Sequence, residues 1–379
     1  MTAAGGEDMP RFMLVPDSYK GTMSSMQVCE AMERGIRRVL PEAIVDSLPV
    51  ADGGEGSVDA FLHAIGGKKR AADVCGPYFD KIEASYGVLG DGQTAVIEMA
   101  ACAGLPLVFN RKDPSRTTTY GVGELMLRAA ADGCKQIIMC LGGSATNDGG
   151  CGAAAAAGIR FYDKNGRQFI PVGGSLKDIV FIDTSGVSPA LAGVSVITMC
   201  DVDNPLCGER GAAYVFAPQK GAGAQMARAL DEGLRNLAKV ARADELARTA
   251  GSGAAGGMGF GMQVFFNSNL RMGIETVLDV AGFDELLPGT DYVFTGEGRI
   301  DPQSMRGKVV MGVARRAKRA GVPVIAVVGD ISDGIEEAYD GGVTAIFSIN
   351  RVALEHEAAR KRAPRDLELT VADIVRILH

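Results

Sequence analysis

Short apolar segments that alternate with helical patterns constrain this fold more than any other feature of the sequence. Residues 11–16 ("RFMLVP") have the composition of a buried strand, and "AIVDSLPV" follows at 43–50. Near the other end of the chain, "DYVFTG", "VPVIAVVG" and "TAIFSI" repeat the pattern, with helical segments between them. Strands that alternate with helices predict an α/β architecture with mostly parallel strands.

The segment after the first strand shows the helical pattern most clearly. Its apolar residues recur at the spacing that places them on one helix face: Val28, Met32, Ile36 and Val39. Ser24 and Gln27 have the spacing of a capping box, which satisfies free N–H groups at a helix start. We therefore expect an amphipathic helix directly after the first strand.

The middle of the chain has a different character. "KIEASYGVLGDGQTAVIEMA" and "IRFYDKNGRQF" predict hairpins, the second with Asn-Gly at its turn, and "AQMARALDEGLRNLAKVAR" predicts a long helix. An inserted domain explains this change. We predict a three-layer, Rossmann-like parallel-sheet domain built from residues 1–75 and 286–379, and an inserted mixed α/β domain built from residues 76–285.

Charge and composition argue against several classes of protein. The net charge of −7 offers no basic footprint for nucleic acid. The first ten residues lack the basic and apolar regions of a signal peptide, and the apolar runs are too short to span a membrane. We expect a cytoplasmic protein without nucleic-acid or membrane partners, and no feature indicates its oligomeric state.

The eight cysteines are scattered, without any C-x-x-C pair, and the three histidines are remote from one another. This pattern favours neither a disulfide framework nor a zinc site. All eight cysteines are expected to be small buried apolar residues.

In open parallel sheets, ligands collect beyond the carboxyl ends of the strands, so we searched those loops for polar residues. "PDSYKG" follows the first strand, and a Lys just before a helix start suits a phosphate. A capped turn with a solvated Lys explains the same residues equally well. The candidates in this loop are Asp17, Ser18 and Lys20.

Two further loops are rich in glycine. "VADGGEGS" combines Asp52 with the pair Gly53 and Gly54, which allow close approach of the backbone to a ligand. "LGGSATNDGG" leaves an apolar strand through glycines and short polar side chains, a composition that fits phosphate or a polar substrate better than a simple turn. Its candidate residues are Gly142, Gly143, Ser144, Asn147 and Asp148.

Two loops bring several charges together. "MCDVDNPLCG" places Asp201, Asp203 and Asn204 after a strand, where their oxygens could bind Mg²⁺, although Asp-Asn-Pro is also a common turn. "TGEGRIDPQSMRGK" mixes both signs of charge before a helix, which phosphate together with a metal explains better than a surface loop does. Its candidates are Thr295, Glu297, Arg299, Asp301, Ser304 and Lys308.

Familiar nucleotide and hydrolase motifs fit poorly. "GSGAAG" at 251–256 satisfies G-x-G-x-x-G, but it follows a helical segment instead of a strand. "RGKVV" has Val where a P-loop needs a hydroxyl. No G-x-S-x-G is present, and histidine is too scarce to favour a catalytic triad.

Taken together, the loops resemble one known family. "PDSYKG", "LPVADGGEGS", "TTTYGVGEL", "LGGSATNDGG", "DVDNPLCG" and "TGEGRIDPQSMRGK" occur in the order and spacing of the type-1 glycerate kinases, bacterial enzymes that phosphorylate D-glycerate with ATP. The resemblance extends from about Met13 to Ile349. It implies a discontinuous first domain, an inserted second domain, a cleft between them, Mg-ATP as donor and 2-phosphoglycerate as product.

Phosphoryl transfer requires positioning, charge neutralisation and removal of one proton. Lys20, Arg299 and Lys308 are the candidates for neutralising the transferred group. Asp52, Asp201 and Glu297 are the expected Mg²⁺ ligands. Asp201 and Asp301 are the candidates for the base, with Asp201 favoured because it directly ends a buried strand. The loop that contains Asn147 could bind glycerate or the nucleotide phosphates.

Three alternatives remain open from the sequence. The chain could be a kinase for another small hydroxy acid or polyol, or a sensor on the same scaffold without turnover. The sensor hypothesis predicts that charged loop residues have been lost, yet every loop retains them. An NAD-dependent oxidoreductase depends only on "GSGAAG" in an unsuitable context.

Overall fold

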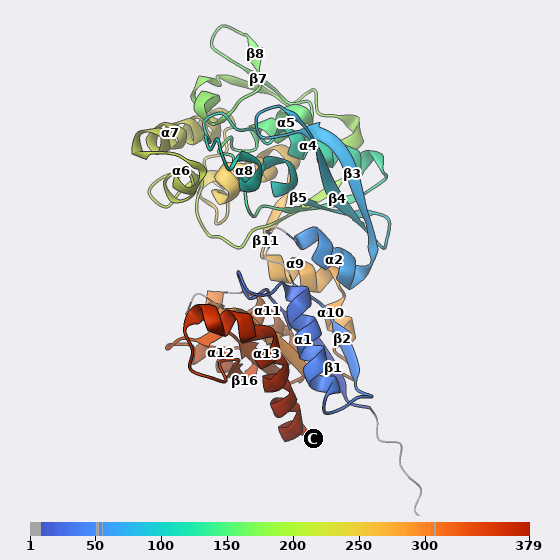
Figure 1. The fold of residues 1–379 in the computed structure, drawn as a ribbon. Helices are drawn as coiled ribbons and strands as arrows, with labels where there is room; N and C mark the ends of the chain where they lie inside the picture. The colour runs from blue at the N-terminus through green and yellow to red at the C-terminus, as the bar shows by residue number, and fades with distance from the viewer. Residues whose placement is uncertain (1–8, 51–52, 55, 303, 307) are drawn as a thin grey trace, which may run out of the picture. The chain divides into compact units, whose positions relative to one another are not determined.

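The computed structural model describes residues 9–50, 53–54, 56–302, 304–306 and 308–379. The chain forms two compact units, one made of Met1–Asp52 with Ile274–His379 and one made of Gly53–Gly273 (Figure 1). The domain borders expected from the sequence, at 75/76 and 285/286, stay a prediction.

The first unit contains a five-stranded parallel sheet to which both ends of the chain contribute. Its strand order is β16 (Val343–Ser348), β14 (Val324–Val328), β12 (Tyr292–Gly296), β1 (Arg11–Pro16) and β2 (Ile44–Ser47). All neighbouring strands pair in parallel. This confirms the predicted parallel sheet from both chain ends, and the apolar segments that predicted the strands are its buried centre.

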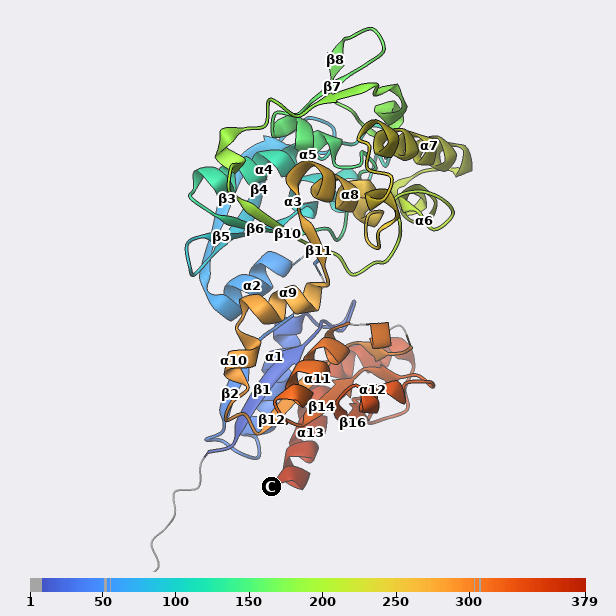
Figure 2. The same cartoon turned by 180° about the vertical axis from the view of Figure 1, so that it is seen from behind.

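Helices cover both faces of this sheet. Helices α1 (Ser25–Arg37) and α13 (His356–Leu378) pack on the face that presents Phe12 and Leu14, and α11 (Val309–Arg319) covers the other face (Figures 1 and 2). The unit is completed by the shorter elements α9 (Gly273–Val280), α10 (Phe283–Leu286), α12 (Glu337–Asp340), β13 (Arg299–Ile300), β15 (Asp330–Ile331) and η6 (Ser304–Arg306). The three-layer arrangement is therefore confirmed.

The start of α1 follows the predicted local chemistry. Ser24 accepts from the N–H of Gln27 at 3.3 Å, and the Gln27 side chain accepts from the N–H of Ser24 at 2.9 Å. Val28, Met32 and Ile36 are all buried. The capping box is confirmed, and the buried face is confirmed for these three residues. Val39, the fourth residue expected on that face, lies beyond the end of α1 and is half-buried.

The second unit is built on a mixed six-stranded sheet. Its order is β11 (Asn269–Arg271), β10 (Ser195–Met199), β6 (Gln136–Cys140), β5 (Thr94–Glu98), β4 (Lys81–Leu89) and β3 (Gly67–Cys75). The first four strands are parallel, whereas β4 is antiparallel to both of its neighbours. The expected β4–β5 hairpin is confirmed, and so is the inserted mixed α/β architecture.

Helices and a small second sheet surround these strands. The sheet contains β7 (Arg160–Tyr162), β8 (Gln168–Phe169) and β9 (Phe181–Asp183), and β7 and β8 form the predicted Asn-Gly hairpin. The helices are α2 (Ser57–Ile65), α3 (Ala100–Ala103), α4 (Tyr120–Ala131), α5 (Cys151–Ala156), α6 (Ala212–Phe216), α7 (Ala224–Val240) and α8 (Ala254–Phe266), with short turns η1 (Leu105–Val108), η2 (Gly173–Asp178), η3 (Pro189–Leu191), η4 (Pro218–Lys220) and η5 (Leu246–Arg248).

All eight cysteines are free thiols. Six of them are buried, as expected, whereas Cys75 and Cys207 are only half-buried. Among the helices in the described part of the chain, none combines the length and apolar character that crossing a membrane requires.

Candidate active site

The first group of expected site residues follows two neighbouring strands of the five-stranded sheet. β1 and β12 pair in register up to Pro16 and Gly296, so Asp17 and Glu297 leave the sheet next to each other. The N–H of Asp17 donates to the carbonyl of Gly296 at 2.8 Å. Both acidic residues are mostly buried, with exposed fractions of 8% and 6%. This sheet edge therefore gathers negative charge where parallel sheets usually bind ligands.

Glu297 has the most unusual environment in this group. Burial is the main cause that raises the pKa of its carboxyl from 4.5 to about 7. The neighbouring carboxylates of Asp17 and Asp301 raise the pKa further, whereas a hydrogen bond from Ser304 and the charge of Lys308 oppose the rise. The Oε1 atom of Glu297 has no hydrogen-bond partner among the residues that the structure describes. Glu297 thus interacts with four other residues that the sequence predicted for the site.

Tyr19 and Gly296 show how tightly this edge is packed. The Tyr19 hydroxyl donates to the carbonyl of Val327 at 2.6 Å. A Cβ on Gly296 would lie 2.0 Å from the same carbonyl oxygen, so a side chain has no room there. Burial, with a smaller contribution from the charge of Glu297, raises the pKa of Tyr19. The phenol therefore stays protonated and acts as a donor that ties the loop to β14.

Two of the expected binding residues make contacts within the fold. Thr295 is fully buried, and its hydroxyl donates to the carbonyl of Val15 at 2.8 Å. Ser18 is half-buried, and its N–H donates to Asp17 Oδ1 at 2.6 Å. These bonds hold the start of each loop in place. A direct role of Thr295 and Ser18 in binding stays a prediction.

The basic residues of the first unit are more accessible. Lys20, Arg299 and Lys308 are exposed, and Lys308 directly precedes the first residue of α11. Asp301 and Ser304 fix the turn before that helix, because Asp301 Oδ1 accepts from the N–H of Ser304 at 3.1 Å. Exposed cations around buried carboxylates are the charge pattern that a phosphate and metal site requires.

The glycine-rich loops of the second unit pack directly on each other. The N–H of Gly142 donates to the carbonyl of Gly53 at 2.8 Å. A Cβ on Gly142 would lie 2.4 Å from the Cα of Gly54. Gly143 is exposed and has a φ of 74°, which favours glycine. The structure therefore brings these four predicted glycines together, while Asp52 lies outside the described residues.

Ser144 and Lys220 form a buried polar contact next to these glycines. Lys220 is 1% exposed, and its ammonium donates to Ser144 Oγ and to the carbonyl of Thr146, both at 2.7 Å. Burial lowers the pKa of Lys220 to about 7, and the nearby Asp148 opposes this shift. No sequence pattern points to Lys220, which lies in an Ala-rich and Gly-rich segment far along the chain.

Asp148 is fully buried, and both of its carboxylate oxygens accept hydrogen bonds from neighbouring residues. Its Oδ2 atom accepts from the N–H and the hydroxyl of Thr119, both at 2.8 Å, and from the N–H of Gly152 at 3.1 Å. Its Oδ1 atom accepts from the N–H of Gly150 at 3.1 Å. Burial raises the pKa of Asp148, against these hydrogen bonds. Asp148 thus joins the loop to the starts of α4 and α5, and its role in binding stays a prediction.

Asn147 is the residue of this loop whose polar groups the protein leaves unmatched. It is fully buried, and neither Oδ1 nor Nδ2 has a hydrogen-bond partner within the described chain. The same is true of the Thr146 hydroxyl. An unmatched buried polar atom costs about 1–3 kcal/mol, so such atoms in native proteins require an explanation.

The segment "GSGAAG" has a packing role in this unit. Ala255, Gly256 and Gly257 form a kink in α8, with φ values of 54°, 69° and 86°. A Cβ on Gly256 would lie 2.0 Å from the carbonyl oxygen of Thr146. The motif follows no strand, and it packs against the loop that contains Asn147. Both observations agree with the poor fit of this motif to a dinucleotide-binding site.

Asp201 follows β10, as its position after an apolar segment predicts. It is exposed, and its Oδ1 atom accepts from the N–H of Gly273 at 2.7 Å. Asp203 is paired with Arg210 at 3.2 Å, also at the surface. Within the described residues, no group of three or more potential ligand side chains is arranged to hold a metal ion. The expected metal set of Asp52, Asp201 and Glu297 stays a prediction.

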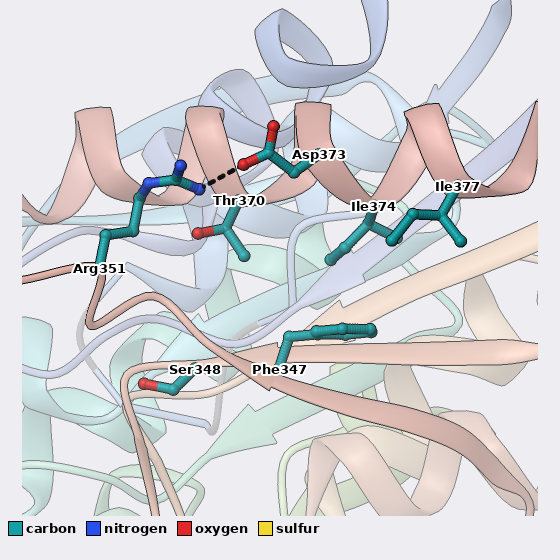
Figure 3. Close-up of a pocket in the computed structure, with 7 residues that line it drawn as sticks. All are labelled: Phe347, Ser348, Arg351, Thr370, Asp373, Ile374 and Ile377. Atoms are coloured by element: carbon teal, nitrogen blue, oxygen red, sulfur yellow. Dashed lines mark hydrogen bonds and ion pairs between the residues drawn. The ribbon is translucent and has the colours of Figure 1, made fainter.

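A cavity of about 330 Å³ lies elsewhere in the first unit, between β16 and α13 (Figure 3). Phe347, Ile374 and Ile377 give it apolar walls, and Arg351 pairs with Asp373 at its rim at 2.8 Å. None of the site residues expected from the sequence lines this cavity, so it supports no role in phosphoryl transfer.

The fold and these loops define the class of the protein: it is an α/β enzyme of the kinase type, with carboxylates and basic side chains at the ends of parallel strands. Comparison with known proteins gives the family. The sequence profile described as the glycerate kinase family matches residues 12–379.

Individual relatives agree over nearly the whole chain. A glycerate kinase from Halalkalibacterium halodurans is 44% identical over 97% of both chains. The glycerate 2-kinase of Escherichia coli K12 is 42% identical over 96% of this chain and 98% of its own. A crystal structure of a protein from Salmonella typhimurium LT2, provisionally designated glycerate kinase 2, superposes with a TM-score of 0.86 at 40% identity over 98% of both chains. The chain therefore belongs to the glycerate kinase family.

Proposed function

We propose that this enzyme transfers the γ-phosphoryl group of ATP to the 2-hydroxyl of D-glycerate and releases ADP and 2-phosphoglycerate. The convergence of Asp17, Glu297, Asp301 and Lys308 at one sheet edge is the observation that carries this proposal. The name of the Escherichia coli relative, glycerate 2-kinase, supports the choice of hydroxyl. ATP is a cytoplasmic metabolite, so we place the reaction in the cytoplasm.

The basic side chains supply charge neutralisation in this proposal. Lys20, Arg299 and Lys308 are exposed on the loops of the first unit, where they can reach the oxygens of the transferred group. Lys and Arg at such positions stabilise the charge that spreads over the phosphoryl oxygens in the transition state. Lys20 has the central role, because it follows the same strand as the buried Asp17.

The acidic side chains fit a magnesium ion. Mg²⁺ prefers carboxylate oxygens and is usually held by one or two of them together with phosphates, which suits the unmatched Oε1 of Glu297. We assign Asp52, Asp201 and Glu297 to this ion. When bound, Mg²⁺ supplies positive charge that neutralises the phosphate oxygens.

Asp201 is proposed as the residue that accepts the proton of the glycerate hydroxyl, with Asp301 as the alternative. The hydrogen bond from the N–H of Gly273 orients the Asp201 carboxylate, and an oriented base contributes roughly 10²–10⁴-fold to the rate. Asp301 accepts from the N–H of Ser304 instead. Asp201→Asn should lower kcat by at least about 10²-fold, and near wild-type activity would transfer the role to Asp301.

The glycine-rich loops complete the proposed site. Gly53, Gly54, Gly142 and Gly143 let the backbone approach a substrate closely. In the adjoining segment, the unmatched amide of Asn147 is the group that we assign to a substrate anion. Asn147→Ala should therefore raise the KM of glycerate or of ATP. The proposal requires the loops of both units to meet at one cleft during catalysis.

One assay tests the reaction directly. The purified protein is incubated with Mg-ATP and a panel of D-glycerate, other small hydroxy acids and polyols, and the release of ADP is followed by a coupled enzyme. Phosphorus NMR of the product distinguishes 2-phosphoglycerate from 3-phosphoglycerate. Preference for another acceptor would make the chain a kinase for that compound, and binding without turnover would make it a sensor.

A further inference from the structure

Lys220 connects a distant part of the chain to the loop that contains Asn147. It ends the short turn η4, and its two acceptors, Ser144 and Thr146, lie 76 and 74 positions earlier in the sequence. Both bonds are buried and both measure 2.7 Å. The ammonium group thus fixes the spacing between a side chain and a carbonyl within one loop.

Burying an ammonium group at this position is unfavourable in free energy. Moving an ammonium group out of water carries a large desolvation penalty, which an apolar side chain of similar length, such as Met, avoids. The penalty is visible in the lowered pKa of Lys220, and the counter-charge comes from Asp148 in the same loop. Packing alone therefore does not explain a lysine at this position.

The loop is held from a second side by the kink in α8. A Cβ on Gly256 would lie 2.0 Å from the Thr146 carbonyl oxygen and 2.7 Å from the Asn147 Cα. The N–H of Gly149 donates to the Gly256 carbonyl at 3.1 Å. Lys220 and this kink therefore hold Thr146 and Asn147 from two sides, and both residues carry buried side-chain polar atoms without a partner in the described chain.

We propose that Lys220 is a positioning residue for phosphoryl transfer. Through Ser144 and Thr146, it holds the loop in the conformation that presents Asn147 to an anionic group of a substrate. That group is the glycerate carboxylate or a nucleotide phosphate, which share the same oxygen chemistry. This inference rests on the proposed function, because it takes the loop to be part of the substrate site.

The test compares three variants by steady-state kinetics, with D-glycerate and Mg-ATP varied separately. Lys220→Met removes the ammonium group and keeps the length of the side chain. Ser144→Ala removes one acceptor and leaves the ammonium of Lys220 and the nearby charge of Asp148 in place. Lys239→Met is the matched control, because Lys239 is an exposed lysine on α7 of the same unit. Urea unfolding followed by circular dichroism reports the stability of each variant.

Lys220→Met should lose on the order of 10²-fold in kcat/KM, the usual effect of a small misplacement of binding groups. Ser144→Ala should lose roughly 3–10-fold, as expected for one hydrogen bond. In both variants the KM of one substrate should rise, and the identity of that substrate shows whether the loop binds glycerate or the nucleotide.

A role in stability alone predicts a different result. Lys220→Met would then unfold at lower urea but keep the KM values and the kcat per folded molecule of Lys239→Met, and this outcome overturns the proposal. If Lys220→Met does not fold, the kinetics of Ser144→Ala provide the test. KM and kcat values equal to those of the wild type for that variant would then overturn the proposal. Turnover of D-glycerate by the wild type and by Lys239→Met tests the proposed function separately.

Discussion

Glu297 makes a quantitative prediction about folding stability. Its pKa rises from 4.5 to about 7 on folding, mainly through burial. The folded protein therefore binds more protons than the unfolded chain between about pH 4.5 and 7, and the free energy of unfolding falls as the pH rises through this window. At about 1.4 kcal/mol per pKa unit, this shift corresponds to about 3 kcal/mol at pH 8.

The substitution Glu297→Gln removes this titration while keeping the shape of the side chain. The variant should resemble the wild type at pH 4.5 and exceed its stability by up to about 3 kcal/mol at pH 8. The variant should also lose activity, because the Glu297 carboxylate, although its burial is unfavourable, is the proposed ligand of Mg²⁺. Such a gain in stability with a loss of function is expected of a strained active-site group.

The assay is urea unfolding from pH 4.5 to 8, without divalent metal, followed by far-ultraviolet circular dichroism. Glu42→Gln is the matched control, because Glu42 is an exposed glutamate of the same unit. Addition of Mg²⁺ at pH 8 should stabilise the wild type and leave Glu297→Gln unchanged, since a ligand that binds the folded state raises its stability. Parallel pH dependence in wild type and Glu297→Gln would refute this account of Glu297.

Three further predictions follow from the second unit and the proposed cofactor. Gly256→Ala should destabilise the protein by several kcal/mol, because its Cβ would lie 2.0 Å from the carbonyl oxygen of Thr146. Gly193 also has a positive φ but has open space around it, so Gly193→Ala should lower the free energy of unfolding by only about 1 kcal/mol in the same urea assay. Asp148→Asn should destabilise the protein by more than Gly193→Ala does, because it removes the carboxylate charge that favours the buried ammonium of Lys220 and leaves an amide among the N–H and hydroxyl donors that bind Asp148 Oδ2; a smaller loss than that of Gly193→Ala would contradict this role of Asp148. Chelation of divalent metal should abolish ADP release, and added Mg²⁺ should restore it; activity that persists in chelator would remove the metal from the mechanism.

The parts of the fold that the sequence predicted depend on local patterns. The strand β1 and the buried face of α1 follow from the spacing of apolar residues, and the capping box depends on two residues three positions apart. These features need no knowledge of distant contacts.

The unpredicted parts depend on contacts between residues far apart in the chain. Lys220 meets its acceptors across 74 and 76 positions, and nothing in "FAPQKG" distinguishes it from a solvated lysine. The kink at Ala255 is similar, because an alanine at φ 54° contradicts its local preference. The kink is explained only by the close approach of Gly256 to the carbonyl oxygen of Thr146. Residues that serve a site indirectly are therefore the ones that sequence patterns miss.

The loop "LGGSATNDGG" shows why composition alone could not assign the chemistry. Its glycines suggested a backbone left bare for a ligand, yet a Cβ on Gly142 would collide with Gly54, and one on Gly149 would lie 2.4 Å from Leu237. Close packing accounts for these two glycines whether or not a ligand binds. Loss of activity after their replacement would therefore not separate folding from binding. The unmatched amide of Asn147 has no such packing explanation, so its replacement is the informative experiment on this loop.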